Sequence, residues 1–164
     1  MDNIATFQEE YPSLESYWRS VILFGRNVAS YKFALAESLL DLSNAGKSDV
    51  TLSELAIPYS KHLCEHLKTA PKQATSQSSR FLETCKQFNE KSITEEQLIS
   101  TTVSLGFNNV IDAFHNVNNE EIPVRFYEKD YSNSNKRKYI LLPSKVSRFS
   151  SSWSTSTVAV SLLL

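Results

Sequence analysis

The stretch LESYWRSVILFGRNVASYKFALAESLLDL, from Leu14 to Leu42, decides the fold that this sequence predicts. Its apolar residues recur every three or four positions, which is the spacing of one buried face on an α-helix. The members of this face are Leu14, Trp18, Val21, Ile22, Gly25, Val28, Ala29, Phe33, Ala36, Leu39 and Leu40. Such a face must be covered by other helices, so the stretch predicts one long helix at the centre of a helical domain.

Capping signals divide the chain that follows into shorter helices. Residues 51–54 and 94–97 both match the capping box, in which a Ser or Thr is followed three positions later by Glu or Gln. Ser78 or Ser79 is expected to cap a further helix, because a serine hydroxyl can accept a hydrogen bond from a free amide of the first turn. The chain has only three glycines, which also favours helices. The sequence therefore predicts a mainly α fold, a bundle of about five helices.

The pattern changes after Pro123. Residues 124–127 and 139–142 are short, apolar and aromatic, and a polar linker separates them, which predicts a small C-terminal β-hairpin. From Ser147 onward serine and threonine dominate, which is typical of an irregular tail. We expect the tail to be disordered or to come from a shifted or truncated reading frame. The predicted organisation is a helical domain over 1–123, a basic β-hairpin packed on it over 124–146, and the tail over 147–164.

Charge is distributed unevenly along the chain. Residues 1–124 contain 10 Lys and Arg against 16 Asp and Glu, whereas residues 125–164 contain 7 against 2. A basic segment on an acidic body suits contacts with phosphates, and it also suits a solvated hairpin edge or docking on the body itself. If the segment binds nucleic acid, the predicted contact residues are Arg125, Lys129, Lys136, Arg137, Lys138 and Lys145.

Cellular location is predicted from the chain start and from the two cysteines. The start, Met1-Asp2-Asn3, lacks the basic leader of a secretory signal peptide. We therefore expect Cys64 and Cys85 to be reduced thiols. The longest uncharged run has an apolar part far shorter than the roughly 20 residues of a membrane span. These features predict a cytoplasmic protein without a membrane segment.

The sharpest local motif is His62-Leu63-Cys64-Glu65-His66. It matches the H-x-x-E-H spacing of one class of zinc metalloproteases, with two histidines on one helix face and Glu65 as the general base. A third zinc ligand would have to come from another element. The competing interpretation is structural, because the histidines flank a buried helix face near a helix C-terminus. A zinc-dependent hydrolase that uses His62, Glu65 and His66 is therefore an alternative hypothesis.

Four segments together resemble a known family. They are residues 16–36, 62–66, 78–88 and 105–115. Over residues 14–142 the chain resembles the N-terminal helical region of bacterial HNH endonuclease-like proteins. In that family a nuclease module follows the helical region, but no His-Asn-His core or cysteine pair follows residue 142 here. The resemblance implies a non-catalytic helical module without a cofactor, which binds DNA or a separate nuclease module.

A third hypothesis is a structural or regulatory interaction protein. The density of Trp, Tyr and Phe along residues 14–42 exceeds what one small core readily covers. This observation would fit a homodimer that forms through the long helix.

Overall fold

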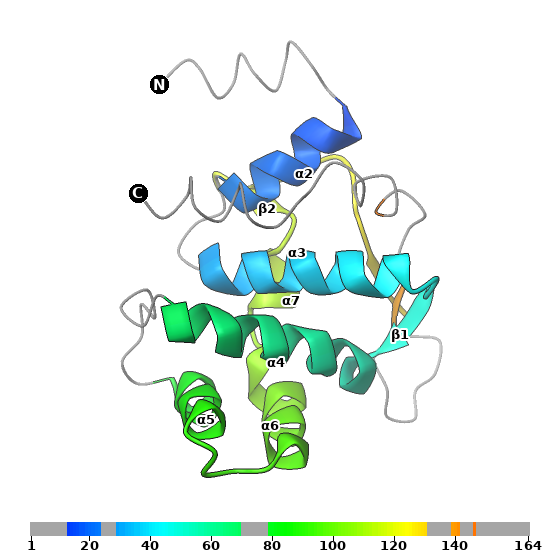
Figure 1. The fold of residues 1–164 in the computed structure, drawn as a ribbon. Helices are drawn as coiled ribbons and strands as arrows, with labels where there is room; N and C mark the ends of the chain where they lie inside the picture. Colours follow the sequence, from blue (N-terminus) through cyan, green and yellow to red (C-terminus); the bar gives the residue numbers. More distant parts are fainter. Residues whose placement is uncertain (1–12, 24–28, 70–78, 131–138, 142–145, 147–164) are drawn as a thin grey trace.

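The computed structural model describes residues 13–23, 29–69, 79–130, 139–141 and 146, and this part of the chain is mainly helical (Figure 1). The helices are α2 (Leu14–Leu23), α3 (Ala29–Asn44), α4 (Leu52–Thr69), α5 (Arg80–Asn89), α6 (Glu95–Thr101), the π-helix η2 (Thr102–Gly106) and α7 (Val110–Ala113). The strands are β1 (Asp49–Thr51), β2 (Asn116–Val117), β3 (Glu120–Glu121), β4 (Glu128–Asp130) and β5 (Tyr139–Leu141). The predicted mainly α class is confirmed.

The prediction of one long helix from Leu14 to Leu42 is wrong. The described part of this stretch forms two helices, α2 and α3, which pack against each other, and one straight helix cannot do that. Predicted members of the apolar face are nevertheless buried within each helix: Trp18 and Val21 on α2, and Ala36 and Leu39 on α3. Periodicity identifies helical residues, but it does not show where one helix ends and the next begins.

Helices α3 and α4 lie side by side through the middle of the molecule (Figure 1). Helix α2 packs on α3, while α5 and α6 pack on α4. None of the described helices is both long enough and apolar enough to cross a membrane. Helices α2, α5 and α6 therefore all pack against the central pair formed by α3 and α4.

The predicted helix starts are confirmed by hydrogen bonds. At the start of α4, the Thr51 N–H donates to Glu54 Oε2 at 2.9 Å and the Glu54 N–H donates to Thr51 Oγ1 at 3.2 Å. A second capping box joins Thr94 and Gln97 at α6. Ser79 caps α5 by accepting the Leu82 N–H. These starts were predictable because a capping box depends on residues three positions apart.

The predicted C-terminal hairpin differs from the sheet that forms. Strand β4 covers residues 128–130 rather than 124–127, and it pairs antiparallel with β5 as expected for a hairpin. Strand β1 then pairs with the other edge of β5, which gives a three-stranded sheet in the order β1-β5-β4. Phe126 and Tyr127 are buried in the core instead of forming the first strand. The pairing of β1 with β5 could not be predicted from the local sequence, because a strand of three residues is too short to show the alternating pattern of a β-strand.

A second hairpin, β2–β3, was not predicted. Its two-residue turn is Asn118-Asn119, with φ of 52° and 72°. Positive φ at both turn residues is typical of the type I′ turn that suits antiparallel strands, and asparagine tolerates this conformation. The predicted tail, residues 147–164, lies outside the described residues.

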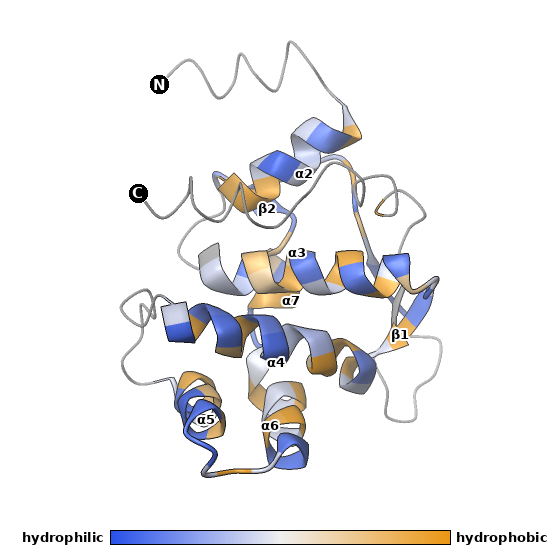
Figure 2. Ribbon diagram, viewed as in Figure 1, coloured by the Kyte–Doolittle hydropathy of each residue, from blue (hydrophilic) through white to orange (hydrophobic). Residues whose placement is uncertain are grey.

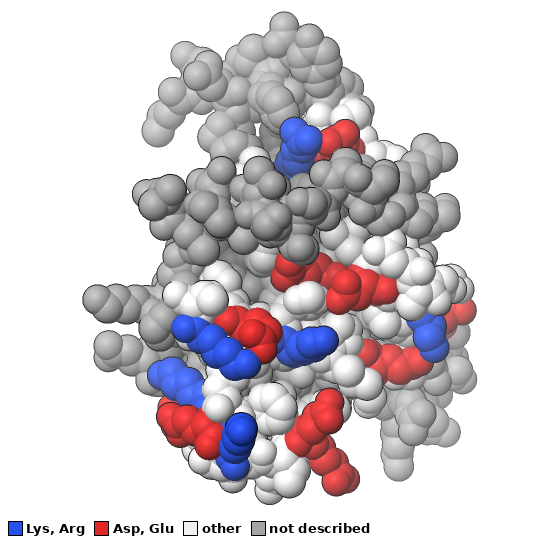
Figure 3. Space-filling view, viewed as in Figure 1, with Lys and Arg blue, Asp and Glu red and all other residues white. Residues whose placement is uncertain are grey.

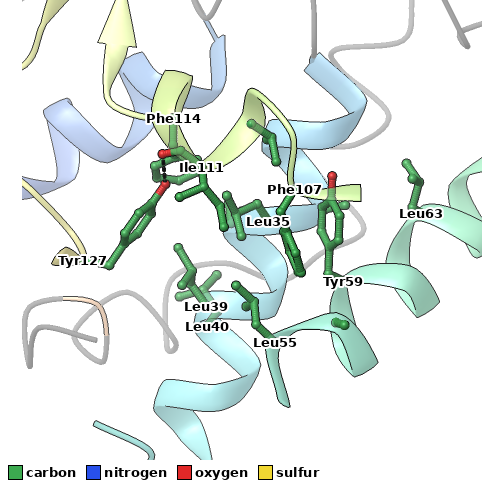
Figure 4. Packing of buried hydrophobic residues seen from close by; sticks show 14 of the residues in the cluster. Leu35, Leu39, Leu40, Leu55, Tyr59, Leu63, Phe107, Ile111, Phe114 and Tyr127 are labelled. Carbon is green, nitrogen blue, oxygen red and sulfur yellow. Dashed lines mark hydrogen bonds between the residues drawn. The ribbon is translucent and has the colours of Figure 1, made fainter. Parts of the chain in front are cut away.

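The core is rich in aromatic rings that come from several elements. The Trp18 ring meets Phe126 edge to face at a centroid distance of 4.9 Å, and Tyr59 stacks on Phe107 at 4.9 Å. Figure 2 shows hydrophobic and hydrophilic residues alternating along the helices. Figure 4 shows α3 and α4 side chains converging with residues 107–127, and the Tyr127 hydroxyl donating to the Ile111 carbonyl at 2.7 Å. Residues 126 and 127 therefore share one core with the helices.

Candidate functional site

A polar cluster lies along the seam between α3 and α4, where the sequence motif places its two histidines. Both ring nitrogens of His62 contact carboxylates of α3: Nε2 lies 2.6 Å from Asp41 Oδ2, and Nδ1 lies 3.2 Å from Glu37 Oε2. His66, one turn further along α4, lies with its Nε2 3.2 Å from Ser30 Oγ. We call Glu37, Asp41, His62 and His66 the seam cluster.

The seam cluster places two carboxyl groups against one imidazole at the contact between α3 and α4. Burial raises the pKa of Glu37, the charges of His62 and His66 lower it, and the Asp41 carboxylate raises it. The net result is a pKa of Glu37 above its ordinary value. The seam cluster therefore joins α3 and α4 through polar side-chain contacts.

The seam cluster lacks the geometry of a zinc site. Glu37 and Asp41 contact opposite nitrogens of the His62 ring, so one ion cannot contact both carboxylates and the ring in this arrangement. Glu65, the predicted general base, instead pairs with Lys68 at 2.6 Å, and its side chain is 61% exposed. Among the described residues, no group of three His, Cys, Asp or Glu side chains could hold a metal ion. The zinc-dependent hydrolase stays a prediction that this geometry does not support.

The predicted nucleic-acid contacts are only partly within the described residues. Arg125 forms an ion pair with Glu121 at 2.5 Å, and Lys129 forms one with Asp112. The other four residues, Lys136, Arg137, Lys138 and Lys145, lie outside the described residues. Strands β4 and β5 pair through Asp130 and Tyr139, so residues 131–138 join the ends of two paired strands. The sequence between β4 and β5 therefore contains three of the predicted basic residues, Lys136, Arg137 and Lys138.

Two polar side chains, Lys32 and His115, are buried beside the segments that follow α7. Lys32 is 1% exposed, its Nζ donates to the Asn116 carbonyl at 2.8 Å, and burial lowers its pKa to about 8. His115 Nε2 accepts the Phe126 N–H at 3.0 Å. Burial, followed by the charges of Arg125 and Lys32, lowers the pKa of His115 to about 4. His115 is thus a neutral ring with its proton on Nδ1. Lys32 joins α3 to β2, whereas His115 joins two positions that both follow α7.

Two surface grooves in the described part each contain both an acidic and a basic side chain. A groove of about 660 Å³ runs between α5 and η2, and its lining includes Arg80, Glu83, Gln87 and Ser104. Another of about 440 Å³ lies beside Asn109, whose φ is 74°. The face shown in Figure 3 carries both basic and acidic side chains. Neither groove gathers charges of a single sign that would select a ligand.

Comparisons with protein-family models, with curated proteins and with solved structures find no match for this chain. The resemblance to HNH endonuclease-like proteins therefore stays a prediction from the sequence.

Proposed function

We propose that this chain is a non-catalytic helical module of an HNH-endonuclease-like protein, which binds nucleic acid or a nuclease partner through its basic C-terminal segment. The observation that carries the proposal is the antiparallel pairing of β4 with β5. This pairing fixes both ends of residues 131–138, the part of the chain that contains Lys136, Arg137 and Lys138.

The anchoring of the basic segment supports the proposal. Strand β5 pairs on its other edge with β1, which leads directly into α4, so the sheet is tied to the helical body. Phe126 and Tyr127, just before β4, are buried in the core. A cationic segment held at both ends loses less conformational freedom on binding than a free tail would.

The distribution of charge favours an anionic partner at this end of the molecule. The acidic body repels a polyanion, while residues 125–164 attract it, so the long-range field would steer a nucleic acid to the basic segment. Arg125 and Lys129 already pair with carboxylates. We therefore expect Lys136, Arg137 and Lys138 to contribute more to binding than these two residues.

The test is a salt series of duplex DNA binding, measured by fluorescence anisotropy. Each phosphate contact contributes about 0.9 to the slope of log K against log salt for B-DNA, so K136Q/R137Q/K138Q should reduce the slope by up to about 3. The matched control is K61Q/K86Q/K91Q, which removes the same charge from α4, α5 and the turn after α5 and should leave the binding slope near that of the wild type.

Two outcomes would contradict the proposal in its nucleic-acid form. One is the absence of salt-dependent DNA binding by the full chain at low salt. The other is an equal loss of slope in both triple variants, which would mean that net charge alone drives the binding. A complex that forms with a nuclease and is insensitive to salt would instead favour the protein partner.

A further inference from the structure

The only two cysteines of the chain meet across the contact between α4 and α5. Cys64 lies on α4 and Cys85 on α5, and both side chains are buried. The Cys64 thiol lies 3.8 Å from the Cys85 carbonyl oxygen, to which it donates. In this structure both residues are free thiols. The two helices are also joined by the Asn89 amide, which donates to the Cys64 carbonyl at 2.9 Å.

We propose that Cys64 and Cys85 form a reversible disulfide that locks α4 to α5 when the protein meets a small-molecule disulfide oxidant. The proposal rests on the placement of two buried cysteines across one helix contact, with the Cys64 thiol against the Cys85 backbone, and is independent of the nucleic-acid function. Cys64 and Cys85 are 21 residues apart in the sequence, and no sequence motif indicates that they are neighbours in the fold.

The environment assigns different roles to the two thiols. The hydrogen bond from Cys85 lowers the pKa of the Cys64 thiol, burial and the charge of Glu65 raise it, and the charge of Lys68 lowers it, with a net lowering. The same thiol contact, together with burial, raises the pKa of Cys85. Because the thiolate is the nucleophile and Cys64 is 2% exposed against 0% for Cys85, Cys64 is the attacking residue and Cys85 the resolving one.

The exchange with oxidised glutathione balances in two steps. The Cys64 thiolate attacks one sulfur of glutathione disulfide, a mixed disulfide forms, and one glutathione leaves as a thiolate with the electron pair of the broken bond. Cys85 then loses its proton to solvent and attacks the Cys64 sulfur, which displaces the second glutathione. Two protein thiols are oxidised to one disulfide, while one glutathione disulfide is reduced to two thiols.

A cross-link at this place would close a loop that includes residues 70–78. Closing a loop of about 20 residues restricts the unfolded chain, so the oxidised protein should unfold at a temperature about 5–10 °C higher. The change would act on the α4–α5 contact and leave the seam cluster on the opposite side of α4 in place.

The experiment incubates the folded full chain with oxidised glutathione and analyses it by intact mass and peptide mapping under non-reducing conditions. The expected product is a monomer that has lost two hydrogen atoms, contains a Cys64–Cys85 peptide pair and shows the higher melting temperature, reversed by dithiothreitol. C85S should stop at a glutathione adduct on Cys64. C64S should stay unmodified, because the attacking thiolate is absent.

The proposal is overturned if both thiols of the folded wild type stay free while the urea-unfolded chain oxidises under the same conditions. It is also overturned if the folded protein forms only intermolecular dimers or stable glutathione adducts. Because mapping of the wild type gives this answer by itself, the test remains decisive if a serine variant fails to fold.

Discussion

At the scale of single residues, His115 shows how burial makes a titratable group sensitive to acid. Its ring accepts the Phe126 N–H and must stay neutral, and its pKa is about 4 in the fold against an ordinary value of 6.5. Between these values the unfolded chain binds more protons, so the free energy of unfolding should fall by about 3 kcal/mol as the pH drops from 6.5 to 4. Urea unfolding measured across this range should show the loss.

The variant H115Q provides the comparison at the same scale. Its amide oxygen can accept a hydrogen bond but does not titrate, so most of the pH dependence between 4 and 6.5 should disappear relative to the wild type. An unchanged difference between the two pH values in H115Q would contradict the assignment. Other groups would then be responsible for the acid sensitivity.

At the scale of elements, the seam between α3 and α4 depends on His62. Replacing it by alanine leaves the half-buried Glu37 carboxyl without its imidazole, so H62A should lower the free energy of unfolding by about 1 kcal/mol. H62Q, which still offers a donor, should lose less. Urea unfolding at pH 6 measures both, with the exposed neighbour substitution K61A as the control. A loss in K61A as large as that in H62A would indicate a general effect on α4 instead.

At the scale of the whole molecule, the segment before β4 and the helical body should unfold together. Phe126 is fully buried against Trp18, and truncation of a buried phenylalanine typically costs about 3–5 kcal/mol. F126A should therefore shift the unfolding of the helices, followed by far-UV circular dichroism, as one transition to lower denaturant. If the helical transition stayed at the wild-type midpoint, the segment would be an appendage with no share in the core.

The predictability of the fold follows from the range of the interactions. The helix starts at Thr51 and Thr94 were predicted because each capping box is contained within four residues. Strand β1 and the true position of β4 were missed, because their pairing with β5 joins residues far apart in sequence. For the candidate site, the spacing of His62 and His66 correctly placed both on one side of α4. Their partners on α3 could not be seen, since no local pattern records which helix lies opposite.

The sequence by itself determined the helical class, the capped helix starts and the uneven charge, because each depends on neighbouring residues or on composition. Only the tertiary structure decided that residues 14–42 supply two packed helices, that carboxylates hold His62 on both sides, and that Cys64 meets Cys85. The physical reason is that these contacts depend on how separate elements pack. Packing is a property of whole surfaces and is not contained in the periodicity of any one segment.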